Sequence, residues 1–252
     1  MFARQSIIMF RKINSFCKDI LLYSRLFYLI YPFRKFFLFL YNFSMLTAWT
    51  SKNNKKIKQN DFFRPFRKYT DRMEGFKYVS DRFRLTADHP IVYLEFGVAS
   101  GVSFKWWMQN NTHENSRFYG FDTFEGLPEN WGFFYKKGDM KHEVMASDDN
   151  RHVFIKGIFQ DTFLKFIGEN LPELNSAKRK VIHLDADLFS STLFVLSQIY
   201  PYLKKGDILI FDEFSVPNHE FFAVQIFQKS FYVQLEPISA INNFYQTIFQ
   251  VV

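Results

Sequence analysis

The chain has 252 residues, of which 48% are hydrophobic and 23% charged, and its formal net charge is +7. This length fits one large domain or one domain with an appendage, and the composition is that of a globular protein rather than a disordered one. The single cysteine, Cys17, cannot form an internal disulfide, so the sequence favours a reducing, cytoplasmic setting.

The positive charge is concentrated at the N-terminus. Residues 1–60 hold about 11 Lys and Arg residues against one acidic residue, Asp19. The remainder is slightly acidic, so the globular part gives no electrostatic reason to expect nucleic acid as a partner. The longest uncharged window, 36–51, is shorter and more polar than the roughly 18 to 20 apolar residues that a membrane span needs. The segment does not match a signal peptide either.

The N-terminal pattern predicts two amphipathic helices, roughly over residues 5–30 and 33–48, with Pro32 breaking or kinking the first. Their basic, aromatic surfaces allow two interpretations. They pack on the domain or on a second subunit, or they lie on an anionic membrane surface as a peripheral contact. The aromatic arm also leads us to expect a homo-oligomer. SKNNKKIKQN, from Ser51, is a polar linker, so we predict an arm with linker over residues 1–60 and one domain over 61–252.

Apolar, β-rich runs alternate with helical patterns from residue 90 onward. The predicted strands are 91–96, 118–121, 152–155, 181–184 and 207–211, and the predicted helices are 103–109, 162–169, 190–202 and 219–229. This order predicts an α/β fold with a mostly parallel sheet and helices on both faces. Two final strand-like runs, 231–236 and 243–251, predict a closing antiparallel pair. Ligands of such open sheets bind at the carboxyl ends of the strands.

The first of these strands ends in EFGVASG, which contains Glu95, Gly97 and Gly101. Gly97 permits a tight turn and Gly101 lets the next helix pack closely. The spacing E-x-G-x-x-x-G differs from the G-x-G-x-x-G of dinucleotide-binding proteins, so a nicotinamide cofactor is disfavoured. It is similar to the first motif of class I S-adenosylmethionine-dependent methyltransferases, which holds the methionine part of the cofactor. A purely structural turn is the alternative.

Two later strand ends carry polar groups that fit the same cofactor. Asp122, after the second strand, can accept hydrogen bonds from both ribose hydroxyls, although an aspartate there can also be a turn former. Gln160 and Asp161 follow the third strand and would face an adenine ring bound beside Asp122. Capping of the following helix is the alternative for these two residues.

The fourth strand delivers two carboxylates, Asp185 and Asp187, in VIHLDADLFSST. Two carboxylates about 4 Å apart repel by roughly 4 kcal/mol at an effective dielectric near 20, so water or a cation should offset the repulsion. Asp212 and Glu213 follow the fifth strand. Because neighbouring parallel strands end side by side, these side chains can converge with Asp185.

Five motifs occur in one order along residues 90–215: EFGVASGVS, FYGFDTFEGLPENW, FIKGIFQDT, IHLDADLFSST and ILIFDEF. Together they resemble the macrocin and mycinamicin sugar O-methyltransferases, which are class I, metal-dependent enzymes with a seven-stranded Rossmann-like fold. The resemblance implies S-adenosylmethionine as cofactor and a divalent cation held by Asp185, Asp212 and Glu213. Oxygen ligands with no Cys or His at the same place favour Mg²⁺ over Zn²⁺ as this cation. It also implies, as acceptor, a hydroxyl of a sugar, glycan or secondary metabolite.

The same resemblance suggests catalytic roles. Asp185 would act through the cation, and Asp187 is a candidate general base or orienting residue, with a helix N-cap as its alternative. In the similarly folded catechol O-methyltransferases a lysine lies a turn beyond the first metal aspartate. Leu188 occupies that position here, which disfavours a phenolic acceptor.

The segment 125–150 is long for a simple connection and is predicted to be a lid. Its aromatic residues Trp131, Phe133, Phe134 and Tyr135 could provide sugar-stacking faces or pack in the core. Two rival functions stay open. One is an inactive cofactor-binding protein whose arm recruits partners or membrane, and the other is a related metal-dependent hydroxylase or N-methyltransferase.

Overall fold

The computed structural model describes residues 2–131 and 134–252. Its contacts divide the chain into two compact units, Met1–Tyr41 and Asn42–Val252, called here the arm and the C-terminal unit. The arm contains α1 (Phe2–Ser24), the 3-10 helix η1 (Leu26–Phe33) and the start of α2 (Arg34–Asn53). The C-terminal unit therefore takes in part of the segment that the sequence assigns to the arm and linker.

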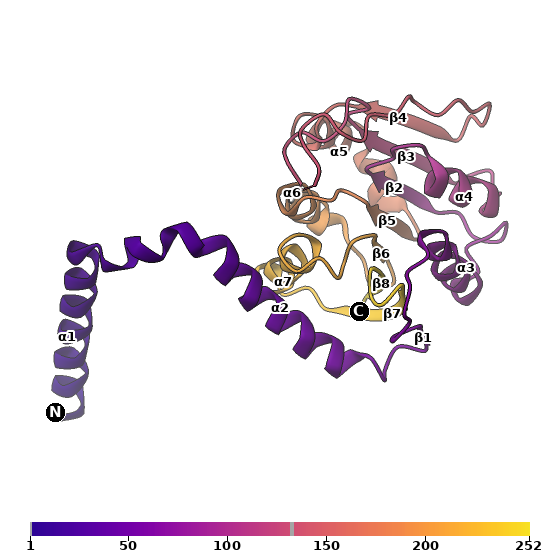
Figure 1. The fold of residues 1–252 in the computed structure, drawn as a ribbon. Coiled ribbons are helices and arrows are strands. Elements are labelled where there is room, and N and C mark those ends of the chain that lie inside the picture. Colours follow the sequence, from indigo (N-terminus) through magenta and orange to yellow (C-terminus); the bar gives the residue numbers. More distant parts are fainter. Residues whose placement is uncertain (1, 132–133) are drawn as a thin grey trace. The chain divides into compact units, whose positions relative to one another are not determined.

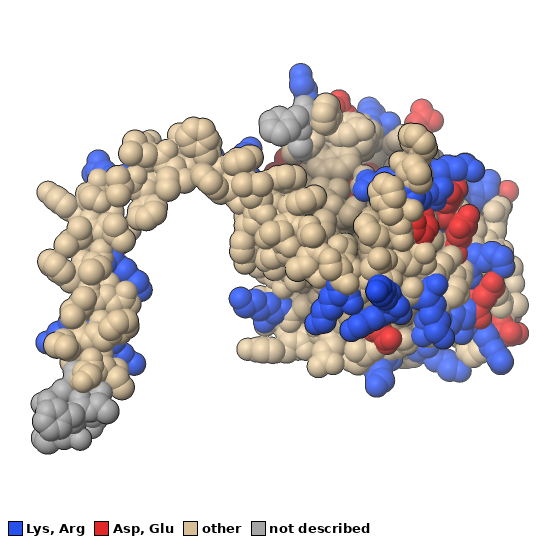
Figure 2. Space-filling model, turned by 60° about the horizontal axis from the view of Figure 1, so that its bottom comes forward, with Lys and Arg blue, Asp and Glu red and all other residues tan. Residues whose placement is uncertain are grey.

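The first helix of the arm is shorter than predicted. It ends at Ser24, because Arg25 adopts a left-handed conformation with φ of 53°, and Pro32 lies inside η1 rather than at the end of a long helix. Figure 2 shows the surface of the arm, on which scattered Lys and Arg side chains interrupt a largely uncharged exterior. Among the residues that the structure describes, no helix combines the length and the apolar character needed to cross a membrane.

The C-terminal unit is built on one eight-stranded sheet, with the strand order β1-β7-β8-β6-β5-β2-β3-β4 (Figure 1). The strands are β1 (Gln59–Asn60), β2 (Val92–Phe96), β3 (Arg117–Asp122), β4 (His152–Lys156), β5 (Lys180–Leu184), β6 (Ile208–Phe211), β7 (Leu235–Ile241) and β8 (Gln246–Val251). Only β8 runs antiparallel to its neighbours, β6 and β7. The mostly parallel sheet and the closing antiparallel pair are thus confirmed.

Two elements were not predicted from the sequence. The strand β1 adds an eighth strand by pairing in parallel with β7, and its two polar residues carry no strand pattern. The helix α3 (Arg72–Phe83), preceded by the 3-10 helix η2 (Tyr69–Asp71), contains Gly75, where an added Cβ would lie 3.3 Å from the side chains of Ile248 and Ser239. This glycine allows close packing on the sheet but weakens the local helix pattern.

Helices cover both faces of the sheet, as predicted (Figure 1). They are α3, α4 (Val102–Asn110), α5 (Phe159–Ser176), α6 (Phe189–Ile199) with the 3-10 helix η3 (Tyr200–Tyr202), and α7 (Glu220–Phe231). The strands β2, β5 and β6 are buried along their whole length, which is typical of central parallel strands covered on both faces.

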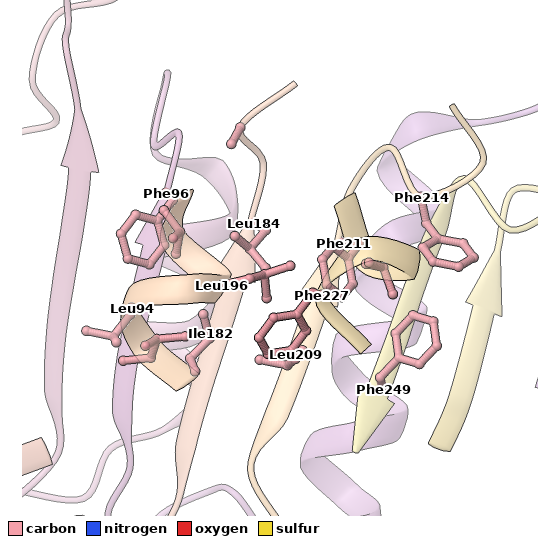
Figure 3. Packing of buried hydrophobic residues seen from close by; sticks show 14 of the residues in the cluster. Leu94, Phe96, Ile182, Leu184, Leu196, Leu209, Phe211, Phe214, Phe227 and Phe249 are labelled. Carbon is pink, nitrogen blue, oxygen red and sulfur yellow. The ribbon is translucent and has the colours of Figure 1, made fainter. Parts of the chain in front are cut away.

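The buried apolar residues form one cluster on each face of the sheet. On the first face, side chains of the strands, such as Leu184 and Phe211, meet Leu196 of α6 and Phe227 of α7 (Figure 3). Trp49 of α2 packs on the same cluster, with its ring centroid 4.8 Å from that of Phe214. On the second face, the helices α3 and α4 contribute residues such as Phe76 and Trp107. The core thus holds the strand ends rigidly in place.

The tail differs from prediction in its boundaries. Phe231 still belongs to α7, which ends where Tyr232 becomes left-handed, so β7 begins only at Leu235. The turn before β8 contains three successive left-handed residues, Asn242, Asn243 and Phe244. Left-handed residues do not fit a strand. The last strand therefore begins at Gln246, whereas the sequence predicted a start at residue 243.

Candidate active site

The carboxyl ends of the parallel strands open into one cavity of about 430 Å³. Most of the residues predicted to form a site line it: Glu95, Gly97, Asp122, Gln160, Asp185, Asp187 and Glu213. Three predicted residues do not line the cavity: Gly101, Asp161 and Asp212. Gly101 is the N-cap residue of α4, and Asp212 is fully buried.

Residues 97–101, called here the glycine loop, follow β2 and pass very close to the end of β5. Gly97 has a φ of 97°, and an added Cβ would lie 1.8 Å from the backbone oxygen of Asp185. Its N–H donates to the backbone oxygen of Phe121 over 2.8 Å. Gly101 is also left-handed, with φ of 75° at the start of α4. A residue with a side chain at position 97 would fill the space between two strand ends, so this cradle requires glycine.

Asp122 ties the glycine loop to the end of β3. One carboxylate oxygen accepts the N–H of Ala99 over 2.8 Å and the other accepts the N–H of Phe124 over 2.7 Å. Each carboxylate oxygen can accept more than one hydrogen bond. Asp122 can therefore shape the loop and still accept donors from a ligand in the cavity.

The pair at the start of α5 separates in the structure. Gln160 lines the cavity, whereas Asp161 is exposed on the first turn of the helix and does not line it. Neither is the N-cap of α5, because that position belongs to Ile158 and carries no side-chain capping bond.

This separation predicts a difference between two neighbouring substitutions. Gln160→Ala is expected to weaken S-adenosylhomocysteine binding about fivefold, as expected for the loss of one hydrogen bond of about 1 kcal/mol. Asp161→Ala should leave the affinity unchanged, because its side chain points away from the cavity. Isothermal titration of both variants measures this. Equal weakening by the two substitutions would contradict the assignment of Gln160 alone to the cavity.

The carboxylates after β5 and β6 converge because these strands pair in parallel, with Leu184 opposite Phe211. Oxygens of Asp185, Asp187 and Glu213 lie within 4.8 Å of one another, and a second group of the same size joins His183, Asp185 and Asp212. The carboxylate of Asp185 is common to both groups. The convergence expected from the strand order is therefore present, and Asp187 takes part in it together with Glu213.

Burial sets the electrostatics of this carboxylate cluster. It raises the pKa of Asp185 and of Glu213 well above the ordinary value, and nearby carboxylates add to the effect. The pKa of Asp187 is raised to about 7 by burial and by the charges of Asp212 and Asp122. Burial also acts on Asp212, but His183 and Arg72 outweigh it, so the pKa of Asp212 is lowered. Arg72 also lines the cavity, so its guanidinium is a positive charge beside these carboxylates.

Several buried oxygens of the cluster have no hydrogen-bond partner among the described residues. They are Oε2 of Glu213, Oδ1 of Asp212 and Oε1 of Glu220. Glu220, at the first position of α7, uses its other oxygen to accept the N–H of Glu213 over 2.9 Å. Buried carboxylate oxygens normally carry partners. These orphaned oxygens fit a divalent cation with oxygen ligands.

Two residues that contact the carboxylates, Tyr69 of η2 and Arg72 of α3, lie in helices that the sequence did not predict. Nη1 of Arg72, at the start of α3, lies 3.0 Å from Oδ2 of Asp212, 3.5 Å from Oδ2 of Asp185 and 2.8 Å from the hydroxyl of Tyr69. Tyr69 in turn donates to Asp212. A hydrophobic, positively charged stretch well before the first predicted strand carries no recognisable signal for this role. Arg72 neutralises part of the negative charge on the Asp212 side.

His183 corrects the expectation that no histidine lies at this place. Tyr93 donates its hydroxyl hydrogen to Glu95, and Nδ1 of His183 lies 3.0 Å from the same hydroxyl oxygen. Burial lowers the pKa of His183, but Asp212 and Glu95 outweigh it and raise the pKa to about 9. Mg²⁺ prefers oxygen ligands, so the carboxylate oxygens remain the ligands here that suit it.

Asp187 has a distinctive backbone conformation. Its φ of 57° is left-handed, which aspartate tolerates better than most residues. The N-cap position of α6 is Leu188, which makes no side-chain capping bond. The carboxylate of Asp187 faces the cavity instead. Left-handed non-glycine residues concentrate at functional sites.

The predicted lid lies over the cavity and contributes aromatic surface. Trp131 and Tyr135 stack with ring centroids 5.0 Å apart, and both line the cavity. Glu129 accepts a hydrogen bond from Ser190 over 2.8 Å, which ties the segment to the start of α6. Phe134 is exposed and does not line the cavity, and Phe133 lies outside the described residues.

Comparison with known proteins identifies the family of the chain. The family model of Macrocin-O-methyltransferase (TylF) matches residues 70–249, well beyond the residues 90–215 that carry the sequence motifs. No curated protein sequence matches the chain.

Solved structures share the fold. The calicheamicin methyltransferase CalS11 is 22% identical, with 86% of this chain and 92% of CalS11 covered and a TM-score of 0.56. An apo structure of CalS11, described as a TDP-rhamnose 3'-O-methyltransferase, is 21% identical over 82% of this chain and 93% of that one, with a TM-score of 0.50. The O-methyltransferase NovP is 20% identical over 71% of this chain and 79% of its own, with a TM-score of 0.50.

The family match covers most of the chain, including α3 with Arg72, the glycine loop, both carboxylate pairs and the closing strands, and it leaves out the arm. The chain belongs to the macrocin O-methyltransferase family, and it is an S-adenosylmethionine-dependent O-methyltransferase.

Proposed function

We propose that the chain transfers a methyl group from S-adenosylmethionine to a sugar hydroxyl with the help of Mg²⁺ bound in the cavity. The observation that carries the proposal is the single cavity that joins the glycine loop to the buried carboxylates. It would hold a methyl donor at one end and an acceptor beside a cation at the other. Family membership supports the cofactor and the type of reaction.

For the cofactor, we propose that the loop from Glu95 through Gly97 to Gly101 holds the methionine part. The cradle at Gly97, which a Cβ would fill, leaves room for close approach of a ligand to the backbone. Asp122 would accept from the ribose hydroxyls and Gln160 would face the adenine. Asp161, predicted with Gln160, has weaker support because it does not line the cavity.

For the metal, we propose that Asp185, Asp212 and Glu213 hold Mg²⁺. The orphaned oxygens of Asp212 and Glu213 support this set, since a cation would provide their missing partner. Oδ2 of Asp212 is already engaged by Tyr69 and Arg72, which leaves Oδ1 for the ion. Asp187 offers an oxygen within 4.8 Å of oxygens of Asp185 and Glu213, so it would face the bound acceptor.

When bound, S-adenosylmethionine supplies an activated methyl group, and a divalent cation lowers the pKa of a coordinated hydroxyl. The chain's own residues would do the rest. Asp187 would take the proton from the acceptor hydroxyl. The rigid strand ends would hold donor and acceptor in line, and placement of this kind can provide much of the rate enhancement.

The acceptor is proposed to be a hydroxyl of a sugar, within a nucleotide sugar, a glycan or a secondary metabolite. Trp131 and Tyr135 offer stacked ring faces at the cavity, and such faces suit the apolar side of a sugar ring. CalS11, which shares the fold, is described as acting on TDP-rhamnose. Leu188 in place of a catechol-type lysine makes a phenol less suitable.

The test is to incubate the full chain with S-adenosylmethionine, Mg²⁺ and TDP-rhamnose, and to follow S-adenosylhomocysteine and the acceptor mass. A product heavier by one CH₂ unit is expected, with S-adenosylhomocysteine in equal amount. A product heavier by one oxygen would indicate hydroxylation instead. If TDP-rhamnose is unchanged while S-adenosylhomocysteine still binds, this nucleotide sugar is not the acceptor and the cofactor site is right.

Asp122→Asn provides the matching prediction for the cofactor. The amide keeps the size of the side chain but loses one charged acceptor, and hydrogen bonds to charged groups contribute more than neutral ones. We expect the affinity for S-adenosylhomocysteine to fall about 10- to 100-fold. Titration calorimetry measures it, and unchanged affinity would remove Asp122 from the cofactor site.

Three further expectations from the sequence stay proposals. They are the division into an arm and linker over residues 1–60 and a methyltransferase domain over 61–252, a homo-oligomeric assembly, and a cytoplasmic location. The lone cysteine, Cys17, is exposed in the arm and supports a reducing compartment.

A further inference from the structure

The arm carries an amphipathic helix with an exposed apolar face. In α1, Met9, Ile13, Phe16 and Ile20 follow one another at spacings of four, three and four residues, which places them on one face of the helix. Their side chains are 48–65% exposed. Such a stripe in a globular protein would normally face a core. Here it is presented to the outside.

The other side of α1 carries charge. Arg11, Lys12 and Lys18 are exposed and lie away from the apolar stripe, as do Ser15 and Asp19, and the exposed side chains of Ile8 and Leu22 lie among them. These charges recur through the middle of the helix. A helix with a basic polar face and an apolar face rich in large side chains suits the plane of a membrane surface.

The segment after α1 continues the same chemistry. The large apolar side chains of η1 are 43–73% exposed: Leu26, Phe27, Tyr28, Leu29, Ile30, Tyr31 and Phe33. Between α1 and η1 lies a hollow of about 600 Å³, lined by Lys18 and Arg25 as well as by apolar and tyrosine side chains. Two cations at the rim of an apolar hollow suit an anionic headgroup above an acyl chain.

The net positive charge of the arm favours an anionic lipid surface over a second copy of the arm as its partner. The arm contains seven basic residues, Arg4, Arg11, Lys12, Lys18, Arg25, Arg34 and Lys35, and one acidic residue, Asp19. A symmetric dimer would bring the same basic patch against itself, and like charges brought together repel. An anionic bilayer complements the charge and accepts the apolar side chains at once.

We infer that the arm binds the surface of an anionic lipid bilayer, with α1 lying in the plane of the interface. The apolar stripe and η1 enter the headgroup boundary, and the basic side chains contact lipid phosphates. This contact is separate from the proposed methyl transfer and needs none of the cavity residues. It gives the enzyme a peripheral attachment to a membrane.

The C-terminal unit offers further basic surface of its own. Lys52, Lys55, Lys56 and Lys58, at the end of α2 and in the linker, are all exposed. Figure 2 shows Lys and Arg side chains gathered in a band across one face of this unit. These charges add to the electrostatic attraction to anionic lipids, which is long-ranged only at low salt.

The test is sedimentation of the full chain with vesicles of phosphatidylcholine, with and without phosphatidylglycerol. An apolar-face variant, Ile13→Gln, Phe16→Gln and Ile20→Gln, should lose at least about 100-fold in partitioning, because each lost side chain removes one or more kcal/mol of burial. The matched control, Asn14→Gln and Ser15→Gln on α1, should partition like the wild type.

A charge variant separates the electrostatic part. Arg11→Gln, Lys12→Gln and Lys18→Gln should weaken binding to phosphatidylglycerol vesicles about fivefold for each removed cation, and much less on phosphatidylcholine alone. An unchanged helical circular dichroism signal shows that each variant keeps its helices, including α1, and does not depend on the proposed methyl transfer. Failure of the wild type to sediment with anionic vesicles overturns the inference. So does an oligomer in solution that the apolar-face variant dissociates, since the stripe would then be covered by a second copy.

Discussion

Asp185→Asn is expected to lower methyl transfer by at least about 100-fold while leaving the fold intact. The reason is that Asp185 belongs to both groups of converging carboxylates, so the amide removes one charged ligand whichever set holds the ion. Loss of metal assistance corresponds to several kcal/mol in the transition state, and each 1.36 kcal/mol is tenfold in rate. Turnover of S-adenosylmethionine with saturating acceptor measures the effect.

The same variant should show a distinct stability signature. Burial raises the pKa of Asp185, so its ionised form is held unfavourably in the absence of a cation. The metal-free Asp185→Asn protein is therefore expected to melt no lower than the wild type, while the rise in Tm on adding Mg²⁺ disappears. Such a rise reports binding to the folded state.

Asp161→Asn serves as the matched control, because it changes an exposed aspartate outside the cavity. It should keep both the activity and the Mg²⁺-dependent rise in Tm. If Asp185→Asn also kept both, the carboxylates would not form a metal site, and their burial would need another explanation.

Gly97→Ala is expected to destabilise the chain by at least about 3 kcal/mol and to abolish cofactor binding. The new methyl group would lie 1.8 Å from the backbone oxygen of Asp185, and the residue would have to adopt a φ of 97°. The backbone at residue 97 and the backbone at Asp185 can separate only if the buried end of β2 or of β5 shifts. For a unit of this size the loss corresponds to roughly 6 to 12 °C in Tm.

Gly168→Ala provides the opposite outcome in the same fold. Gly168 lies in α5, is exposed, and has no atom within 4 Å of an added Cβ. Alanine there should raise stability by about 0.5 to 1 kcal/mol, because it restricts the unfolded chain and favours helix. Thermal unfolding of both variants, with titration of S-adenosylhomocysteine, tests the pair. A mild effect of Gly97→Ala would mean that the glycine loop can move and that its closeness to Asp185 is not required.

The sequence alone was sufficient to predict the alternating strands and helices, the closing antiparallel pair and the family. It also predicted that Asp185 and Asp212 would meet. Each of these depends on short-range patterns or on one general rule, that neighbouring parallel strands end at the same edge of a sheet. The register of β5 and β6, with Leu184 opposite Phe211, is the physical form of that rule here.

The tertiary structure alone decided which side chains share the space around those carboxylates. Arg72 of α3 and Tyr69 of η2 both contact Asp212, and the local sequence patterns of these two helices are weak. The ring of His183 lies between Glu95 and Asp212 inside the sheet. It also shows that Asp161 does not line the cavity and that Trp49 of α2 packs against the core of the C-terminal unit. These placements depend on how distant segments pack and in which direction each side chain leaves its backbone. Local sequence patterns carry no information about either, because the contacts that determine them form only when the whole fold is assembled.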